Sequence, residues 1–303
     1  MSRTNSLANS LAGVALAIAA AVSFAANTTL ARIAYDGGSN VMTVLTVRTI
    51  LAGLVVLALL RLSRGPLQLA PRKRLAAYGI GLVLALYSYG MMSAIKFIPV
   101  ALAVLIFYTY PLLTTVYLWL TGRERVNWRS GMAVIAAFAG LILALDIGGA
   151  AFDLRGVAFA TLAALGITVV VIFNSRLVGG GDSRPVTLHM MASATIAYTL
   201  VTLGLGEFAL PAGAPGWWSF IGGPLFYAVA IIAFFIAMSK LGPFRTTLTM
   251  NLEPVSSMMF GFALLGQVLT GWQIFGAGLV ITAVLTVQVV RASETASAKG
   301  ETP

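Results

Sequence analysis

The sequence predicts an all-α integral membrane protein with ten transmembrane helices, arranged as two inverted five-helix repeats with both termini in the cytoplasm. Hydrophobic residues make up 59% of the chain and charged residues only 9%, whereas a soluble domain carries about 25% charged residues. Apolar runs close to the roughly 20 residues that a spanning helix needs follow one another along the chain. An internal sequence repeat and an uneven distribution of Lys and Arg complete the prediction.

The first five predicted spans form the first repeat, residues 10–147, after a polar segment at residues 1–9 that we expect in the cytoplasm. The basic start of the first span is also typical of a cleaved signal peptide, but its apolar run exceeds the about 7–15 residues of a signal core. A basic loop, Arg72-Lys-Arg74, precedes the third span, and the fifth span is short. The five spans are predicted at residues 11–31, 41–60, 75–95, 100–120 and 131–145.

A Gly-rich linker at residues 148–154 leads to the second repeat, residues 155–291. The break Lys240-Leu-Gly-Pro243 separates its third and fourth spans, because glycine and proline interrupt regular structure. A polar cytoplasmic tail at residues 292–303 follows and is expected to be disordered. The five spans are predicted at residues 155–177, 187–206, 219–238, 244–265 and 272–290.

The two halves share a sequence repeat at an offset of 143 residues. Gly13–Ala21 and Gly156–Ala164 begin with the same three residues, and Pro111 and Pro254 occupy equivalent positions. Since each half contains five spans, an odd number, the two halves must have opposite orientations in the membrane. Inverted repeats of this kind occur in many secondary transporters, whose substrate sites lie near the midplane between the repeats.

The distribution of basic residues predicts the orientation. With the N-terminus inside, fifteen Lys and Arg residues fall at cytoplasmic positions and only Arg32, Lys96 and Arg155 at outer ones, as the positive-inside rule requires. Trp217 and Trp218 are typical of an aromatic belt on the outer side. The net charge of +10 would suggest nucleic-acid binding in a soluble protein, but here topology explains it. We therefore expect a surrounding lipid bilayer and no nucleic-acid partner.

The sequence lacks the residues and motifs on which several classes of enzyme depend. The chain has no cysteine, which excludes disulfides and thiolate metal sites. It has no Gly-rich phosphate loop ending in Lys-Ser or Lys-Thr, and no His-Glu-x-x-His motif. Its single histidine, His189, is not preceded by the Gly-x-Ser-x-Gly motif of serine hydrolases. We expect no enzyme activity, no catalytic residues, no cofactor and no metal.

Glu253, followed by Pro254, lies inside an apolar span. A charge at membrane depth is costly and usually faces the interior of a helix bundle or a wet cavity, and a proline removes a helix hydrogen bond. Glu253 is predicted to couple substrate movement to protons or to bind a substrate amine. Alternatively, it is a kink residue whose carboxylate caps a neighbouring helix or stays neutral. Hinges are predicted at Pro99, Pro111, Pro243 and Pro254.

The order and spacing of these motifs resemble the drug/metabolite transporter superfamily, in its ten-helix form built from two EamA-type repeats. The matching features are Lys240-Leu-Gly-Pro243, Glu253-Pro254, the Gly-Arg-Glu124 stretch and the glycines of Gly276-Ala-Gly278. The second half has Gly266-Gln267 where the family usually has Gly-x-Glu. The resemblance covers about residues 10–290. It implies an inner-membrane carrier of small metabolites, often amino acids and often moved outward. Its cavity would lie between spans one to four and six to nine, with spans five and ten outside.

The candidate substrate-cavity residues are polar or aromatic side chains within the predicted spans. A tyrosine offers an apolar face with one hydrogen-bonding tip, and an amide can bind a substrate or hold a neighbouring helix. For each residue the alternative is ordinary helix packing. The set comprises Ser23, Asn27, Tyr87, Tyr108, Tyr110, Asn174, Tyr227, Phe234 and Asn251.

Besides Glu253, three residues are candidates for coupling or gating. Arg48 could bind a substrate carboxylate, extend toward the outer face or pair with Asp36. His189 lies near the predicted cytoplasmic end of its span and could gate by protonation near neutral pH, or be an ordinary interfacial residue. Tyr78, near the inner end of its span, could belong to an inner gate.

Together with the resemblance, the sequence predicts a secondary-active or facilitative transporter in the bacterial inner membrane. It would export small metabolites, in particular amino acids including aromatic or other bulky apolar ones, by alternating access around a central cavity. The alternatives are an exporter of drugs or nucleotide-related metabolites, a channel, or a scaffold without transport activity. Gly131, Gly140, Gly276 and Gly278 permit close helix contact, either in a homodimer or within a monomer.

Overall fold

The computed structural model describes residues 3–94, 97–98, 100–123, 128–145, 153–206, 208–265 and 268–297. These residues form helices and connections, and no strand occurs among them. The helices are α1 (Arg3–Asp36), α2 (Val41–Leu62), α3 (Pro71–Ala94), α4 (Val100–Phe107), α5 (Tyr110–Leu120), α6 (Trp128–Leu145), α7 (Leu154–Val178), α8 (Arg184–Leu205), α9 (Gly213–Leu241), α10 (Pro243–Thr249), α11 (Leu252–Leu265) and α12 (Gly271–Ser297).

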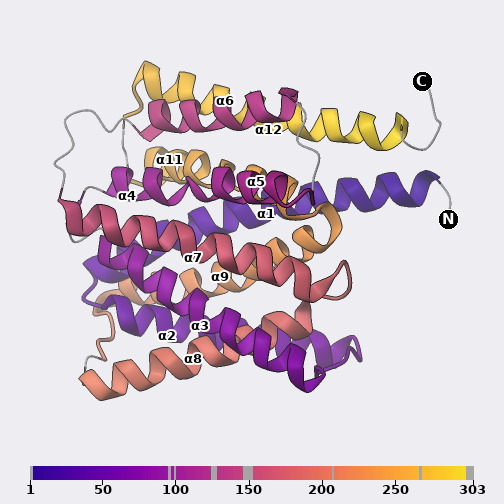
Figure 1. Cartoon of the computed structure of the whole chain (residues 1–303). Coiled ribbons are helices and arrows are strands. Elements are labelled where there is room, and N and C mark those ends of the chain that lie inside the picture. Colours follow the sequence, from indigo (N-terminus) through magenta and orange to yellow (C-terminus); the bar gives the residue numbers. More distant parts are fainter. Residues whose placement is uncertain are drawn as a thin grey trace.

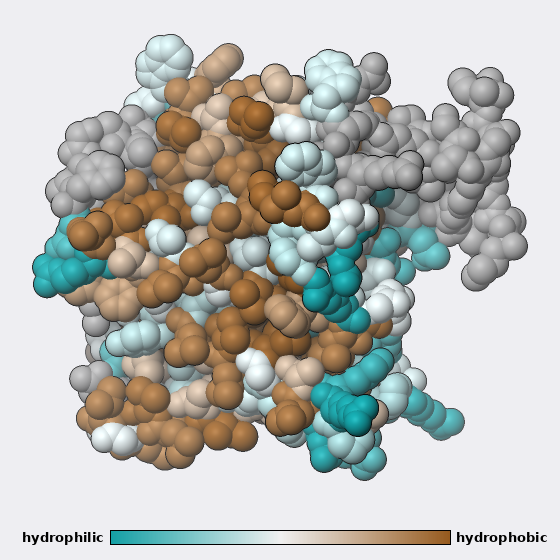
Figure 2. Space-filling view, in the orientation of Figure 1, coloured by the Kyte–Doolittle hydropathy of each residue, from teal (hydrophilic) through white to brown (hydrophobic). Residues whose placement is uncertain are grey.

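The long helices lie side by side in one bundle, and the chain begins and ends at the same end of it (Figure 1). Within the described residues, eight segments are long and apolar enough to cross a membrane, and Ser130–Leu145 is a shorter apolar helix. Figure 2 shows hydrophobic residues over the body of the bundle and hydrophilic residues gathered mainly at the end near the termini. The predicted all-α fold with membrane-length helices is confirmed, whereas the number of ten spans and the side of the termini stay predictions.

Both terminal helices extend further than the sequence predicts. The first helix begins at Arg3, within the polar N-terminal segment. The last helix continues to Ser297, so the expectation of a disordered tail from residue 292 is wrong over residues 292–297. The segment Arg291-Ala-Ser-Glu-Thr-Ala lacks glycine and proline, and its residues are compatible with a helix that has already begun.

Two predicted spans are each divided into two helices. The span at residues 100–120 is interrupted after Phe107, and the span at residues 244–265 after Thr249. Pro111 and Pro254 lie in the first turns of the helices that follow, where a missing N–H removes no helix hydrogen bond. The predicted prolines thus begin new helices at these points, and their role as hinges stays a prediction. Of the other two hinge candidates, Pro243 is the first residue of α10, and Pro99 lies outside the described residues.

Helices α6 and α12 pack closely on one another at one edge of the bundle (Figure 1). A Cβ atom added to Gly276 would overlap the amide nitrogen of Ala144, and one added to Gly140 would lie 2.8 Å from the Gly276 carbonyl oxygen. Of the two roles left open for these glycines, Gly140 and Gly276 therefore serve packing within the chain. Gly131 and Gly278 would meet nothing within 4 Å.

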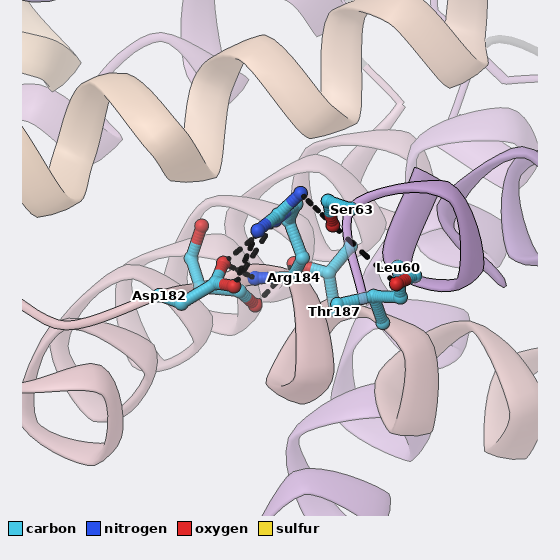
Figure 3. A network of polar contacts seen from close by, with 6 residues as sticks. Leu60, Ser63, Asp182, Arg184 and Thr187 are labelled. Carbon is cyan, nitrogen blue, oxygen red and sulfur yellow. Dashed lines mark hydrogen bonds and ion pairs between the residues drawn. The ribbon is translucent and has the colours of Figure 1, made fainter. Parts of the chain in front are cut away.

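An arginine connects α2 to the start of α8 at the end of the bundle near the termini (Figure 3). Arg184 Nη1 donates to Ser63 Oγ over 2.9 Å, and its Nε and Nη2 donate to the Asp182 carboxylate over 2.9 and 2.8 Å. These hydrogen bonds lower the pKa of the Asp182 carboxyl below its usual value. The pair is therefore charged at neutral pH and fixes the α7–α8 connection against α2.

We expect Gly81→Ala to destabilise the protein and Gly79→Ala, in the same helix, to leave its stability unchanged or slightly raised. A Cβ on Gly81 would overlap the backbone of Met190 in α8, whereas one on Gly79 meets nothing within 4 Å. Overpacking costs about 1–3 kcal/mol, and Gly to Ala in a helix interior contributes up to about 1 kcal/mol. Thermal unfolding of both variants in detergent, followed by circular dichroism, measures the difference. Equal Tm values would contradict the tight α3–α8 contact.

Candidate functional site

A cavity of about 500 Å³ lies inside the bundle, in the half away from the termini. On α1, which runs inward from the N-terminus, its lining residues begin only at Phe24; on α3, which runs in the same direction, they begin at Tyr87. Side chains from α1, α2, α3, α4, α5, α7, α9 and α11 form most of its wall, and α6 and α12 contribute only at their ends. We call this hollow the central cavity.

Most of the predicted substrate and coupling residues meet at the central cavity. Although they are far apart in the sequence, the bundle brings them around one hollow. Their functional roles stay predictions, since position alone does not test them. The predicted residues that line the central cavity are Asn27, Arg48, Tyr87, Tyr108, Tyr110, Tyr227, Phe234, Glu253 and Pro254.

Arg48 and Glu253 are the charged groups of the predicted set that line the central cavity, and both are partly exposed. The Arg48 guanidinium carbon lies 4.4 Å from the centroid of the Tyr227 ring, in a cation–π arrangement. No ion pair joins Arg48 to an acid among the described residues, and Asp36 pairs instead with Arg32 over 3.3 Å. The alternative pairing of Arg48 with Asp36 is therefore wrong. The Arg48 charge stays available to whatever occupies the cavity.

Several buried polar atoms around the central cavity have no hydrogen-bond partner within the described residues. They are the Asn27 carboxamide oxygen, the Arg48 Nε and the hydroxyls of Tyr108 and Tyr227. The Tyr108 hydroxyl lies beside the Glu253 carboxylate without the geometry of a hydrogen bond. Because buried polar atoms are nearly always hydrogen-bonded, their concentration around one hollow indicates that water or a polar ligand occupies it.

Aromatic rings form a second part of the cavity wall. Phe24 contacts Tyr227 and Phe234 edge to face, with ring centroids 5.9 and 6.3 Å apart. Tyr87 stacks on Phe107 with centroids 6.0 Å apart. Such rings bury apolar ligand surface efficiently. The central cavity therefore combines a basic and an acidic side chain with an aromatic wall, which suits a small amphipathic molecule.

Three predicted cavity residues lie elsewhere. Ser23 is buried in α1 and does not line the cavity. Asn251 is 2% exposed and its Nδ2 donates to the Leu248 carbonyl oxygen over 2.9 Å, so it supports the break between α10 and α11. Asn174 lines a different hollow, near the termini. Sequence alone could not separate these cases, because a polar side chain on a helix can bond to nearby backbone instead of a ligand.

Tyr78 and His189 lie together but away from the central cavity. Their ring centroids are 5.4 Å apart, and His189 Nδ1 lies 2.8 Å from the Pro185 carbonyl oxygen. Both residues lie in the first third of their helices, toward the end near the termini. They do not line the central cavity.

Other lining residues were not among the sequence candidates. Helical spacing could have found two of them, because Ser257 follows Glu253 by one turn and Phe24 precedes Asn27 by three positions. The remainder follow from tertiary packing and leave no local pattern. The polar and aromatic residues added by the structure include Phe24, Thr28, Arg32, Ser88, Phe107, Ser257 and Gln273.

Comparisons with known proteins give relatives over most of the chain. The model of the EamA-like transporter family matches residues 11–145 and 154–288. The threonine/homoserine exporter RhtA of Escherichia coli K12 and that of Salmonella typhimurium SL1344 are each 30% identical over 251 residues, which cover 79% of this chain and 79% of the relative. A solved crystal structure with 18% sequence identity covers 92% of this chain and 98% of its own, with a TM-score of 0.76, and so has the same fold.

We expect a thiol at Ser88 to react with a water-soluble maleimide about tenfold faster than a thiol at Ser93, since thiol reactivity depends on access. Both serines lie on α3 and are 5% exposed, but only Ser88 lines the central cavity. The chain has no cysteine, so the single variants Ser88→Cys and Ser93→Cys need no other changes. Labelling rates in detergent measure the effect, and equal rates would contradict a water-filled cavity.

Proposed function

This chain belongs to the EamA-like transporter family, and on that premise we propose that it exports amino acids and related small metabolites across the bacterial inner membrane. Family similarity over both halves and the 30% identity to threonine/homoserine exporters support a small-metabolite exporter rather than an enzyme. The multi-pass placement in the inner membrane follows that of such exporters. The substrate class is then argued from the central cavity.

The observation that carries the proposal is the presence of Arg48 and Glu253 in one cavity. An α-amino acid carries a carboxylate and an ammonium group on one carbon. A guanidinium matches the geometry of a carboxylate, and a glutamate carboxylate accepts hydrogen bonds from an ammonium. Asn27, whose carboxamide oxygen lacks a partner among the described residues, supplies a further polar contact.

The size and wall of the central cavity support the same class. A volume of about 500 Å³ lies within the about 300–1,000 Å³ of small-molecule sites. The aromatic wall formed by Phe24, Tyr87, Phe107 and Phe234 suits an apolar side chain, including an aromatic one. The same wall favours bulky apolar drugs as a second candidate class. A nucleotide is less well matched, since its phosphates need several cations and Arg32 already pairs with Asp36.

Transport by alternating access fits the position of the cavity. With both termini cytoplasmic, the half of the bundle that holds the central cavity is the outer half. Small shifts of two inverted five-helix halves, residues 10–147 and 155–291, would close this half and open the other. The breaks before Pro111 and Pro254 and the Gly242-Pro243 connection supply points for such movement.

We expect reconstituted protein to move amino acids, and Arg48→Gln to reduce the flux by at least about tenfold, since removing one charged partner of a bound group costs about 1.5–3 kcal/mol. The measurement is efflux from proteoliposomes loaded singly with labelled threonine, homoserine, leucine, phenylalanine or tryptophan. Arg72→Gln, a basic residue at the helix end near the termini, is the matched control and should not change the flux. A scaffold would give no flux, and a channel would give flux that does not saturate.

We expect Glu253→Gln to abolish the dependence of flux on a pH gradient while the protein stays folded. The substitution keeps the size of the side chain but removes the group that can take up and release a proton. Flux with and without an imposed gradient, in wild type and variant, measures the effect. A variant that responds to the gradient as the wild type does would exclude Glu253 as the coupling residue, and Glu253 would then act only on the substrate amine or on the helix break.

A further inference from the structure

A second hollow of about 300 Å³ lies at the end of the bundle near the termini. It is bounded by the C-terminal ends of α5, α7 and α9, and the α7–α8 and α9–α10 connections lie at this end in Figure 1. We call it the vestibule; the residues that define it here are Arg123, Asn174, Arg176, Phe235, Met238 and Ser239. Of the described residues, Phe235 is the one that lines both the vestibule and the central cavity.

Among the described residues, the charged side chains that line the vestibule are two cations. Arg123 follows α5, and Arg176 lies in the last turn of α7, with its guanidinium carbon 5.3 Å from the Tyr117 ring centroid. Within the described part of the chain, neither arginine takes part in an ion pair, and no Asp or Glu lines the hollow. A cleft with one sign of charge concentrates ligands of the other sign. The vestibule therefore attracts anionic groups.

A buried amide faces the vestibule without a satisfactory partner. Asn174 is 1% exposed, and its Oδ1 has no hydrogen-bond partner among the described residues. Its Nδ2 contacts only the Met238 sulfur, over 3.9 Å, and a thioether is a weak acceptor. Buried amides are rarely left in this condition. A polar ligand in the vestibule would satisfy this one.

Two helix C-termini complete the vestibule. Gly179, with a φ of +59°, caps the C-terminus of α7, and Gly242, with a φ of +80°, caps that of α9. The C-terminus of a helix carries partial negative charge and stabilises a cation nearby. The vestibule thus offers arginines to a carboxylate and helix ends to an ammonium group, so its polar wall suits a zwitterion.

One face of α9 runs from the central cavity to the vestibule. Tyr227, Ile231, Phe235 and Ser239 are spaced four residues apart and therefore lie on one side of the helix. They cover about 18 Å along the axis at 1.5 Å per residue. Phe235 is 1% exposed and packs against Phe234 with ring centroids 5.2 Å apart. Its ring is part of the wall of both hollows.

We propose that the vestibule is a second binding site, a cytoplasmic port that takes up the amino acid by its carboxylate before Phe235 admits it to the central cavity. Arg176 and Arg123 bind the carboxylate and Asn174 binds a polar group of the ligand. Phe235 closes the passage while the central cavity is open on the other side. The substrate class rests on the proposed function, whereas the charge of the site rests on the geometry of the vestibule alone.

The first experiment measures the charge of the vestibule with a single thiol. The variant Ser239→Cys, in inside-out vesicles, is treated with an anionic sulfonatoethyl or a cationic trimethylammonioethyl methanethiosulfonate reagent. The ratio of the two rates cancels the intrinsic reactivity of the thiol. We expect the anionic reagent to be favoured, and the ratio to fall about tenfold when Arg123→Gln and Arg176→Gln are added, as neighbouring charges dictate. Arg72→Gln is the matched control and should leave the ratio unchanged.

The second experiment measures ligand binding and the passage. Each amino acid of the transport panel is added singly and should slow the labelling of Ser239→Cys if it binds, whereas its amino alcohol, which lacks the carboxylate, should not. Reagent added on the cytoplasmic side should label Ser257→Cys, which lines the central cavity, about tenfold faster when Phe235→Ala is also present. Phe235→Leu, which retains more volume, should give an intermediate rate.

The outcomes separate this proposal from the proposed function. Equal rates for the two reagents, or no protection by any amino acid while flux persists, would overturn the vestibule site and leave the exporter intact. A preference for the anionic reagent that depends on the two arginines, together with slower labelling of Ser239→Cys in the presence of an amino acid, supports the vestibule site. If flux in proteoliposomes is then absent, that result counts against export and not against the site. An equal rate of labelling of Ser257→Cys from the cytoplasm with and without Phe235→Ala would overturn the role of Phe235 as the partition.

Discussion

In hydrocarbon, every backbone amide and carbonyl must find its partner within the protein, and this constraint determines where the bundle can be irregular. Among the described residues, the two predicted spans that break do so next to the central cavity, since Tyr108 and Met250 both line it. The Thr109 hydroxyl donates to the Ile106 carbonyl and the Asn251 amide to the Leu248 carbonyl. These side chains thus donate hydrogen bonds to carbonyl oxygens that would accept backbone N–H groups in a continuous helix. Irregular backbone is tolerated here because it borders a polar hollow rather than lipid.

The same constraint explains the grouping of charge and aromatic rings. An isolated guanidinium or carboxylate in the bilayer core is costly. Arg48 reduces this cost through the face of the Tyr227 ring, and Glu253 borders the cavity beside the Tyr108 hydroxyl. Tyrosines serve both charges because each carries an apolar face and a polar tip. A substrate with one group of each sign would have a polar partner in both side chains.

The sequence predicts much of this arrangement because its strongest signals are local. Apolar runs identify the membrane-length helices, and Pro111 and Pro254 mark the two predicted spans that the structure divides. The sequence also identifies nine of the residues that line the central cavity, among them Asn27 and Arg48. Asn174 and Asn251 differ from Asn27 only in the neighbours that packing gives them, so no local pattern could separate the three. Ser88 and Gln273 were missed because side chains of this kind occur widely on helices without function.

The close contact of Gly140 with Gly276 has a consequence for how the molecule sits in its membrane. Two helices whose backbones touch cannot slide past one another without losing their close packing. Helices α6 and α12 therefore behave as one rigid pair along the edge of the bundle. This helix pair contributes to the wall of the central cavity only through the C-terminal end of α6 and the N-terminal end of α12. Its exposed side chains, such as Ile135 and Leu285, can therefore be replaced to suit a bilayer of different thickness or composition. Such replacements leave the residues of the central cavity unchanged.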